Sequence, residues 1–198
     1  GYIDWERKVD VKQGLVTEIK AVLFPALPSV YPLSFNGAIQ PVLSPDGQKV
    51  AYIVPAAGKK GGVWVWTMSP GQIGFSRGGE PHQVMPNIDD VDLTKAKMRW
   101  SPDSQQVLVD VSERHFLLDQ DRSNDPPRDI TPILQPTLRG WEEDQKQLNA
   151  VKVAAIKDLQ IRKTASESAY LKWSPDETKF IYSKNGVDDF KSVDLKLG

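Results

Sequence analysis

The 198-residue sequence contains no cysteine, which excludes disulfide frameworks, thiolate zinc sites and cysteine nucleophiles but leaves the compartment open. No apolar run approaches the roughly 18 residues that a membrane-spanning helix needs. Charge of one sign is also missing: 25 basic side chains balance 26 acidic ones, which argues against nucleic acid as a partner. The composition, 39% hydrophobic and 26% charged, is that of a folded domain. The chain begins with Gly1-Tyr2 and shows no secretion signal, so we expect a piece of a longer protein.

A motif that occurs three times organises most of the chain. Each copy has an apolar residue, then Ser-Pro-Asp, three further residues and an apolar run rich in β-formers. The three turns are Ser44-Pro45-Asp46, Ser101-Pro102-Asp103 and Ser174-Pro175-Asp176. Each copy predicts a β-hairpin, and we interpret these nine residues as structural rather than catalytic.

The chemistry of the turn supports this prediction. Proline presets the backbone of a type I turn, and the serine and aspartate side chains can bond back to nearby amides. Gly47 tolerates the left-handed region, whereas Ser104 and Glu177 at the same position must avoid that region or carry modest strain. The β-branched and aromatic runs 50–54, 107–111 and 180–183 then follow as strands.

Further strands are predicted after each hairpin, as a four-stranded sheet would require. They are residues 63–68 and 82–85 after the first copy, 115–119 and 128–132 after the second, and 190–195 after the third.

The Trp-Ser-Pro-Asp hairpin and the closing segment Arg128-Asp129-Ile130-Thr131-Pro132 resemble the WD40-like, TolB-type (PD40) β-propeller repeat. The resemblance covers residues 36–198 and implies an all-β fold, a partial β-propeller of about three antiparallel blades. The blades would lie at about 36–88, 89–136 and 164–198. A closed ring takes about four to eight blades, so missing blades or another chain are expected to cover the open sheet edges.

Residues 1–25 differ from the repeat. Tyr2, Trp5, Val9 and Val11, followed by a Gln13-Gly14 turn and a strand to Phe24, are similar to the C-terminal strands of a PEGA domain. That resemblance implies an N-terminal β-hairpin from a small β-sandwich of bacterial surface proteins. Prolines at positions 25, 28 and 32 predict a stiff, extended connector over residues 26–35.

Residues 138–163 break the β pattern and predict one inserted helix. Its apolar side chains fall on one stripe: Trp141, Leu148, Val151, Ala155 and Leu159. Acidic residues at 142–144 and basic residues at 162–163 match the helix dipole at the two ends. The stripe either packs against a sheet or binds a partner.

Two segments resemble catalytic or metal-binding motifs. Residues Gly74-Phe75-Ser76-Arg77-Gly78 match the Gly-x-Ser-x-Gly nucleophile elbow, but no helix follows, and we interpret them as a hairpin loop. Asp119, Asp121 and Asp125 alternate like calcium ligands, but the turn glycine and the bidentate glutamate are missing. A solvated turn is the favoured interpretation, calcium binding stays open, and no cofactor is predicted.

The tryptophans allow two interpretations. Trp100 and Trp173 occupy the position of Leu43 before each turn, which predicts burial. Trp64 and Trp66 share one face of a strand, where they either pack between sheets or form a stacking platform for carbohydrate or peptide.

We therefore expect a non-catalytic binding or scaffold module, not an enzyme, that contacts a protein or a cell-surface glycan through propeller loops. A bacterial cell-envelope or extracellular location is implied by the resemblance alone. The alternative is the substrate-gating propeller of a prolyl-oligopeptidase-like serine peptidase whose catalytic domain is absent here, and a calcium-stabilised lectin-like module is a third possibility. The parent reading frame beyond Gly198 distinguishes the first two.

Overall fold

The computed structural model of the chain describes residue 6 and residues 37–56, 58–68, 79, 81–186 and 188–195. The chain divides into two units, Gly1–Leu33 and Ser34–Gly198, and every described residue except Glu6 belongs to the second. The PEGA-like hairpin predicted for 1–25, apart from Glu6, and the connector at 26–35 lie outside the described residues.

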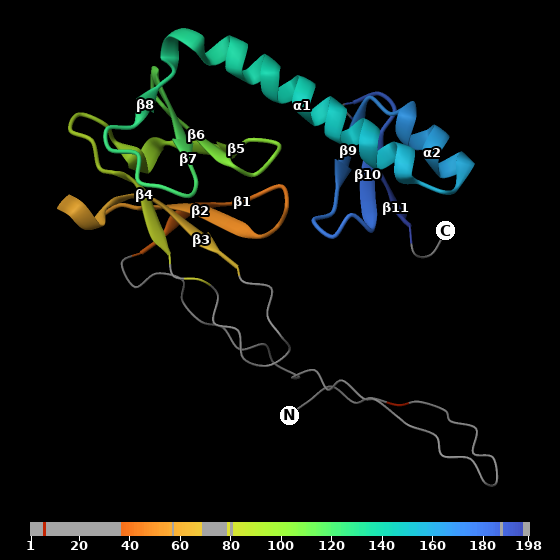
Figure 1. The fold of residues 1–198 in the computed structure, drawn as a ribbon, viewed down its shortest axis with the longest axis horizontal. Coiled ribbons are helices and arrows are strands. Elements are labelled where there is room, and N and C mark those ends of the chain that lie inside the picture. Colours follow the sequence, from red (N-terminus) through yellow and green to blue (C-terminus); the bar gives the residue numbers. More distant parts are fainter. Residues whose placement is uncertain are drawn as a thin grey trace. The chain divides into compact units, whose positions relative to one another are not determined.

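The described residues form three antiparallel sheets in which strands that follow one another in sequence are neighbours (Figure 1). Sheet 1 contains β1 (Ile39–Leu43), β2 (Lys49–Val54), β3 (Gly62–Thr67) and β4 (His82–Pro86). Sheet 2 contains β5 (Lys97–Trp100), β6 (Gln106–Val111), β7 (Arg114–Asp119) and β8 (Arg128–Asp129). Sheet 3 contains β9 (Tyr170–Trp173), β10 (Lys179–Ser183) and β11 (Lys191–Asp194).

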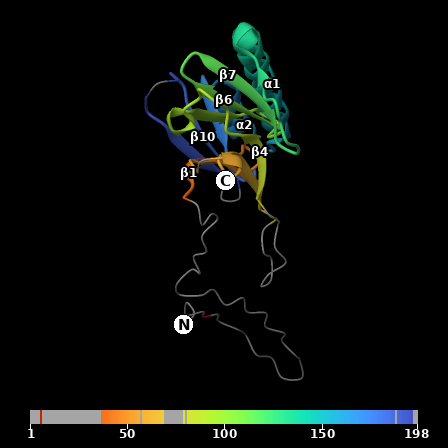
Figure 2. The ribbon, with the colours of Figure 1, turned by 90° about the vertical axis from the view of Figure 1, so that its left-hand side faces the viewer.

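Helical segments join and cover the sheets. They are η1 (Gly58–Lys60), η2 (Leu93–Lys95), η3 (Thr131–Ile133), α1 (Leu134–Ala155) and α2 (Leu159–Ser166). Between sheets 2 and 3 the chain runs through η3, α1 and α2, and a second view shows α1 beside the strands of sheet 2 (Figure 2).

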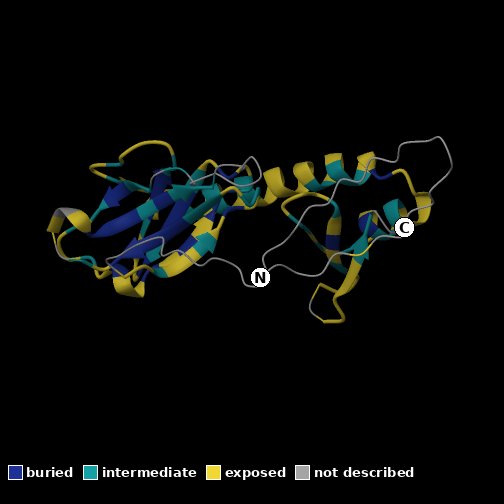
Figure 3. Ribbon diagram, turned by 90° about the horizontal axis from the view of Figure 1, so that it is seen from below, coloured by how far each residue is buried: buried dark blue, intermediate teal, exposed yellow. Residues whose placement is uncertain are grey.

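Sheets 1 and 2 share the largest core. Apolar side chains recur at alternate positions of their strands, so one face of each sheet is apolar and packs against the other sheet. Figure 3 shows the buried residues gathered in these strands. The fully buried members of this core are Ala51, Ile53, Val63, Val65, Val84, Met85, Ala96, Val107, Val109 and Leu118.

Helix α1 contacts two sheets with different parts of its length. Leu134, Leu138 and Trp141 pack against Leu108, Leu117 and Ile130 on the second face of sheet 2. Val153, Ile156 in the connection and Ile161 and Ala165 of α2 pack instead against Phe180 and the neighbouring side chains of sheet 3. Residues 142–148 between these contacts are all exposed, so the helix bridges two packed ends through solvent.

The expectation of an all-β partial β-propeller is wrong. The fold is mixed, with 26% of the described residues in helices and 36% in strands. The difference arises between sheets 2 and 3, where η3 and α1 form 25 consecutive helical residues. The face of sheet 2 that an all-β array would cover with another sheet is covered by the first turns of this helix.

The inserted helix also differs from its prediction at 138–163. It begins at Leu134, because Pro136 falls in its first turn, where a missing N–H costs nothing. It ends at Ala155, and Asp158 starts α2 by accepting the N–H groups of Gln160 and Ile161 at 2.8 and 2.9 Å. The predicted strands, by contrast, are confirmed to within a few residues in all three sheets.

Candidate functional site

The three Ser-Pro-Asp turns share one hydrogen-bond pattern. In each, the serine hydroxyl donates to the aspartate Oδ1, at 2.5 Å in the first two turns and 2.7 Å in the third. The same carboxylate oxygen accepts the N–H two residues later. The serine Oγ accepts the N–H five residues after it, at the start of the next strand. The pattern therefore ties each turn to the strand that follows.

All three turns place a residue in the left-handed region. Gly47 has φ +69°, Ser104 has φ +61° and Glu177 has φ +56°. Of the two predicted alternatives for Ser104 and Glu177, the structure takes the strained one, and in all three turns the N–H of this residue closes the turn. That N–H donates to the serine C=O in every copy, at 2.9, 3.0 and 2.9 Å.

The turns also contact one another. The Oγ of Ser104, a residue that is 1% exposed, accepts the N–H of Asp46 at 3.1 Å. The Nζ of Lys49 donates to the Ser104 C=O at 3.1 Å. A Cβ on Gly47 would lie 2.4 Å from the Cβ of Pro175. The three repeats therefore meet at their turns.

Asp46 is charged at this junction for identifiable reasons. Partial burial acts to raise its pKa, but hydrogen bonds from Ser44 and from the Gln48 N–H, together with the Lys49 ammonium, outweigh that effect. The pKa of Asp46 therefore lies below its ordinary value. The Lys49 Nζ lies 3.5 Å from Asp46 Oδ2.

The tryptophans before the turns are packed rather than displayed. Trp100 is 8% exposed and donates its indole N–H to the Val42 C=O at 2.9 Å, which confirms the predicted burial. Trp173 is half-buried against Phe180, with ring centroids 5.1 Å apart. Leu43 occupies the equivalent position in the first copy, and burial of the tryptophans was predicted from that equivalence, but Leu43 is itself 52% exposed.

Trp64 and Trp66 lie on the face of β3 opposite the core residues Val63 and Val65. Both are half-buried, and Trp64 is paired across the strands with Tyr52. Tyr52 is 2% exposed, and burial raises the pKa of its hydroxyl. The indole N–H groups of Trp64 and Trp173 are buried without a hydrogen-bond partner among the described residues.

Sheet 2 carries a polar cluster that the sequence reasoning missed. The Nδ1 of His115 lies 2.8 Å from Asp110 Oδ1, and Arg99 Nη2 lies 3.0 Å from Asp110 Oδ2. The cluster follows from the strand register, since Asp110 pairs with His115 and lies two residues from Leu108, the partner of Arg99, on the same face of the sheet. The other histidine, His82, contacts the Gln120 C=O through Nε2 at 2.7 Å.

The structure describes only one of the two segments that resemble catalytic or metal-binding motifs. Residues 74–78, the nucleophile-elbow match, lie outside the described residues. Asp119 binds Gln106 Nε2 at 2.9 Å and also Arg122, and these hydrogen bonds hold its pKa below the ordinary value. The structure does not bring Asp121 and Asp125 to it as a metal site: across the described residues no group of three or more His, Asp or Glu side chains could hold an ion.

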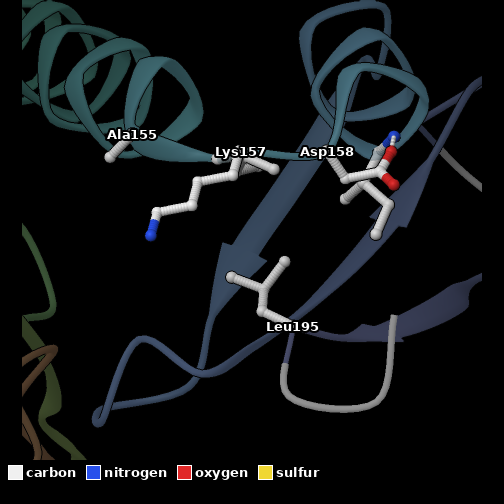
Figure 4. Close-up of a pocket in the computed structure, with 6 residues that line it drawn as sticks. Ala155, Lys157, Asp158 and Leu195 are labelled. Atoms are coloured by element: carbon white, nitrogen blue, oxygen red, sulfur yellow. Dashed lines mark hydrogen bonds between the residues drawn. The ribbon is translucent and has the colours of Figure 1, made fainter.

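Two hollows of about 370 Å³ each occur in the described part of the chain. The first lies between the α1–α2 connection and Leu195, and Figure 4 shows the side chains of Lys157 and Asp158 extending in opposite directions there. The second lies beside Asp89, Asp90 and Asp92. In that hollow Asp92 caps η2, and hydrogen bonds from Thr94 and Lys95 hold its pKa below the ordinary value.

Exposed apolar side chains are concentrated in two places. On the helices, Val151 is 71% exposed and Leu159 is 74% exposed, with Leu148 at 37%. At sheet 3, Tyr170 of β9, Ile181 of β10 and Phe190 just before β11 are exposed by 37%, 40% and 53%. The predicted helical stripe is thus mostly turned to solvent, and only Trp141 of its members packs against a sheet. No helix in the described ranges is long and apolar enough to cross a membrane.

Comparison with known protein families and with curated proteins finds no match for this chain.

Proposed function

We propose that this chain is a non-catalytic protein-binding module of a bacterial cell-envelope protein. The observation that carries the proposal is the apolar stripe, which consists of Leu148 and Val151 near the end of α1 and Leu159 at the start of α2, all exposed to solvent. Monomeric surfaces tolerate single apolar residues, whereas a group of exposed apolar side chains, such as Leu148 and Val151 one turn apart on α1, is typical of a contact surface.

The shape of α1 supports a contact role over a purely structural one. The segment that holds the helix to sheet 2 ends at Trp141, and the segment that holds it to sheet 3 begins with Asn149, whose amide lies 3.5 Å from the Leu171 C=O. Leu148 and Val151 lie where the second contact begins but are not part of it. An amphipathic helix presents such i, i+3 anchors to a groove or to another helix.

The envelope location is supported by the resemblance of the repeat turns and of residues 1–25 to families of bacterial surface proteins. A protein partner is favoured over a glycan because the exposed groups of the stripe are aliphatic, whereas glycan sites rely on aromatic stacking and hydrogen bonds.

The proposal is tested by placing a photo-crosslinking amino acid at position 151 in cells, with position 146 as control. Lys146 is exposed and lies on the opposite side of the same helix. We expect a discrete adduct from 151 that is lost in Leu148→Lys and absent from 146. Leu148→Ala with Val151→Ala should leave the free energy of unfolding within about 1 kcal/mol, because both side chains are exposed. A large loss of stability, or equal crosslinking from 146, would assign the stripe to packing instead.

A further inference from the structure

Sheet 3 has two faces, and the described elements of this chain cover one of them. Alternate residues of a strand point to opposite faces, so Phe180 and Ile181 of β10 lie on different sides of the sheet. The Phe180 side packs against Val153 of α1 and Ile161 of α2. Phe180 is 1% exposed, whereas Ile181 is 40% exposed. The side that carries Ile181 is therefore open in the part of the chain that the structure describes.

Strand register defines the members of this open side, which we call the Ile181 face. Ile181 pairs with Lys172 of β9 and with Ser192 of β11, and Tyr170 lies two residues before Lys172. The ring of Phe190, just before β11, meets the Tyr170 ring edge-on with centroids 5.3 Å apart. The face is thus an apolar surface of Ile181 and two aromatic rings, with a lysine beside it.

The aligned face of sheet 2 binds a helix. The repeat aligns Ile181 with Leu108, because each lies seven residues after the serine of its turn. Leu108 is 0% exposed, and the helical side chains that pack on its face belong to the first turns of α1: Leu134, Leu138 and Trp141. These three residues have the i, i+4, i+7 spacing of one helical stripe. This face of the repeat is therefore suited to an apolar stripe on a helix.

The rim of the Ile181 face is more apolar than that of the aligned face. On sheet 2 the Nδ1 of His115 lies 2.8 Å from Asp110 Oδ1. On sheet 3 the repeat and the register place Ser183 at the position of Asp110 and Phe190 at that of His115. A polar pair is thus replaced by a serine and by a phenylalanine that is 53% exposed. Exposed aromatic side chains grouped with other apolar ones are typical of a contact surface.

The chain carries a helical stripe that its own Ile181 face cannot reach. Leu148 and Val151 lie one turn apart on α1 and are exposed. Val153, which packs on the Phe180 side of sheet 3, points about 160° away from Val151 around the helix. The stripe therefore points away from sheet 3, and the Ile181 face points away from α1. One molecule cannot bring the two surfaces together.

The charge beside the stripe is acidic. At about 100° per residue, Asp144 lies within about 20° of Val151 around α1, and Glu143 lies within about 80°. The basic residues of α1 all lie about 100° or more from Val151: Arg139, Lys146 and Lys152. The side of α1 that carries the stripe is therefore apolar and negatively charged.

The Ile181 face carries the opposite charge. Lys179 and Asp194 share this face by register and form an ion pair at 3.1 Å. Lys172, exposed beside Ile181, gives the face a net positive charge. An acidic helical stripe and a basic sheet face attract each other, and their charges fix the register of the contact.

We propose that copies of this chain associate head to tail, with the stripe of Leu148 and Val151 of one copy on the Ile181 face of the next. Val151 then covers Ile181, and Asp144 approaches Lys172. The two surfaces lie on opposite sides of sheet 3, so the contact repeats from copy to copy instead of closing as a two-fold dimer. The inference rests on the proposed function as a protein-binding module and identifies the partner as a second copy of this chain.

Two complementary variants test the contact by analytical ultracentrifugation of the purified 198-residue chain. We expect the average mass to rise with concentration past that of two chains. Val151→Lys blocks the stripe and Ile181→Lys blocks the face, so each variant alone should associate at least about tenfold more weakly. Mixed in equal amounts, they should form a complex of two chains that grows no further, because one keeps an intact face and the other an intact stripe. A variant that failed to fold would not complement the other.

A charge swap tests the register of the contact. Asp144→Lys and Lys172→Glu should each weaken association about threefold or more. The two changes in one chain should restore it, because opposite charges then meet again across the interface. Lys146→Glu changes an exposed residue on another side of α1 and should leave association unchanged.

Several outcomes would overturn the proposal: a chain that stays monomeric, association that Ile181→Lys leaves unchanged, variants that do not pair when mixed, or a charge swap that restores nothing. A dimer that joins stripe to stripe would show the second outcome. If the chain stays monomeric while position 151 crosslinks to a different protein in cells, this inference fails and the proposed function stands. If the chain associates head to tail but position 151 gives no adduct in cells, the proposed function fails and this inference stands.

Discussion

The hydroxyl of Ser104 accepts the backbone N–H of Asp46 at 3.1 Å, so a turn of sheet 2 satisfies a donor in a turn of sheet 1. Ser104 makes this contact from a left-handed backbone conformation, with φ +61°. Glycine would relieve the strain at this position but would leave the donor of Asp46 without its acceptor. The residue that looks like the poorer turn former therefore provides the contact between the sheets.

This relationship predicts an order of stability at position 104. Ser104→Ala removes the acceptor and keeps the strain, and should cost about 1–2 kcal/mol of unfolding free energy. Ser104→Gly also removes the acceptor but relieves the strain, and should recover about 1 kcal/mol of that loss. Urea unfolding of the two variants measures the order, and an alanine variant as stable as the glycine one would contradict the assigned strain.

Gly47 allows a matched test of the contact with sheet 3. Gly47→Ala adds a Cβ 2.4 Å from that of Pro175 at a residue with φ +69°, whereas Gly37→Ala adds one with nothing within 4 Å at φ +72°. Backbone strain is common to both, at about 1–2 kcal/mol, so the excess loss in Gly47→Ala reports the contact. We expect an excess of about 1 kcal/mol or more, which Pro175→Gly, the change that removes the clashing Cβ, relieves in a double-mutant cycle.

Acid should weaken the junction through Asp46. Its folded pKa lies below the ordinary value, so the unfolded chain binds more protons as pH falls. The stabilisation is present at neutral pH and is lost below about pH 4, as pH passes through the lowered pKa. Asp46→Asn should flatten the dependence of unfolding free energy on pH between about 5 and 2, and the exposed Asp121→Asn serves as control. An unchanged slope in Asp46→Asn would show that its charge does not stabilise the fold.

The start of α1 should depend on one buried side chain. Ile130 is 0% exposed against Leu108 and Leu117, and Ile130→Ala should cost about 2–4 kcal/mol by leaving a cavity. Ile133 is 43% exposed, and Ile133→Ala should cost less than about 1 kcal/mol. Thermal unfolding compares the two, and faster amide exchange over residues 134–141 in Ile130→Ala would place the loss at the helix start.

The strands could be predicted because their signals are local. The turn chemistry of Ser44 and Asp46 and the β-branched runs beside each turn act over a few residues, and the observed strands follow them. The prediction of a single helix at 138–163 rested on one apolar stripe. In the structure α1 packs on sheet 2 through Trp141 and on sheet 3 through Val153, and these two residues lie on different sides of the helix, so a single stripe could not predict its packing. Asp158 was a readable start signal for α2 and was overlooked.

The candidate site was harder to predict for a different reason. The pairing of His115 with Asp110 depends on strand register, which the sequence does not state. The exposure of Ile181 depends on what packs against its sheet: at the same position of the repeat, Ala51 is buried against sheet 2 and Leu108 against the first turns of α1. Residue types identified the turns, whereas the exposed surfaces follow from which elements pack against each sheet.

The exposed middle of α1 gives the helix a further consequence. Each inserted residue would turn everything after it by about 100° and advance it by about 1.5 Å. Inserting one alanine within 142–148 would thus rotate Val153 away from its contact with sheet 3. Inserting seven alanines would nearly restore the orientation of Val153 about the helix axis but would move it about 10 Å along that axis. The number of residues in this exposed stretch therefore sets the angle, about the axis of α1, between the side of the helix that packs on sheet 2 and the side that packs on sheet 3.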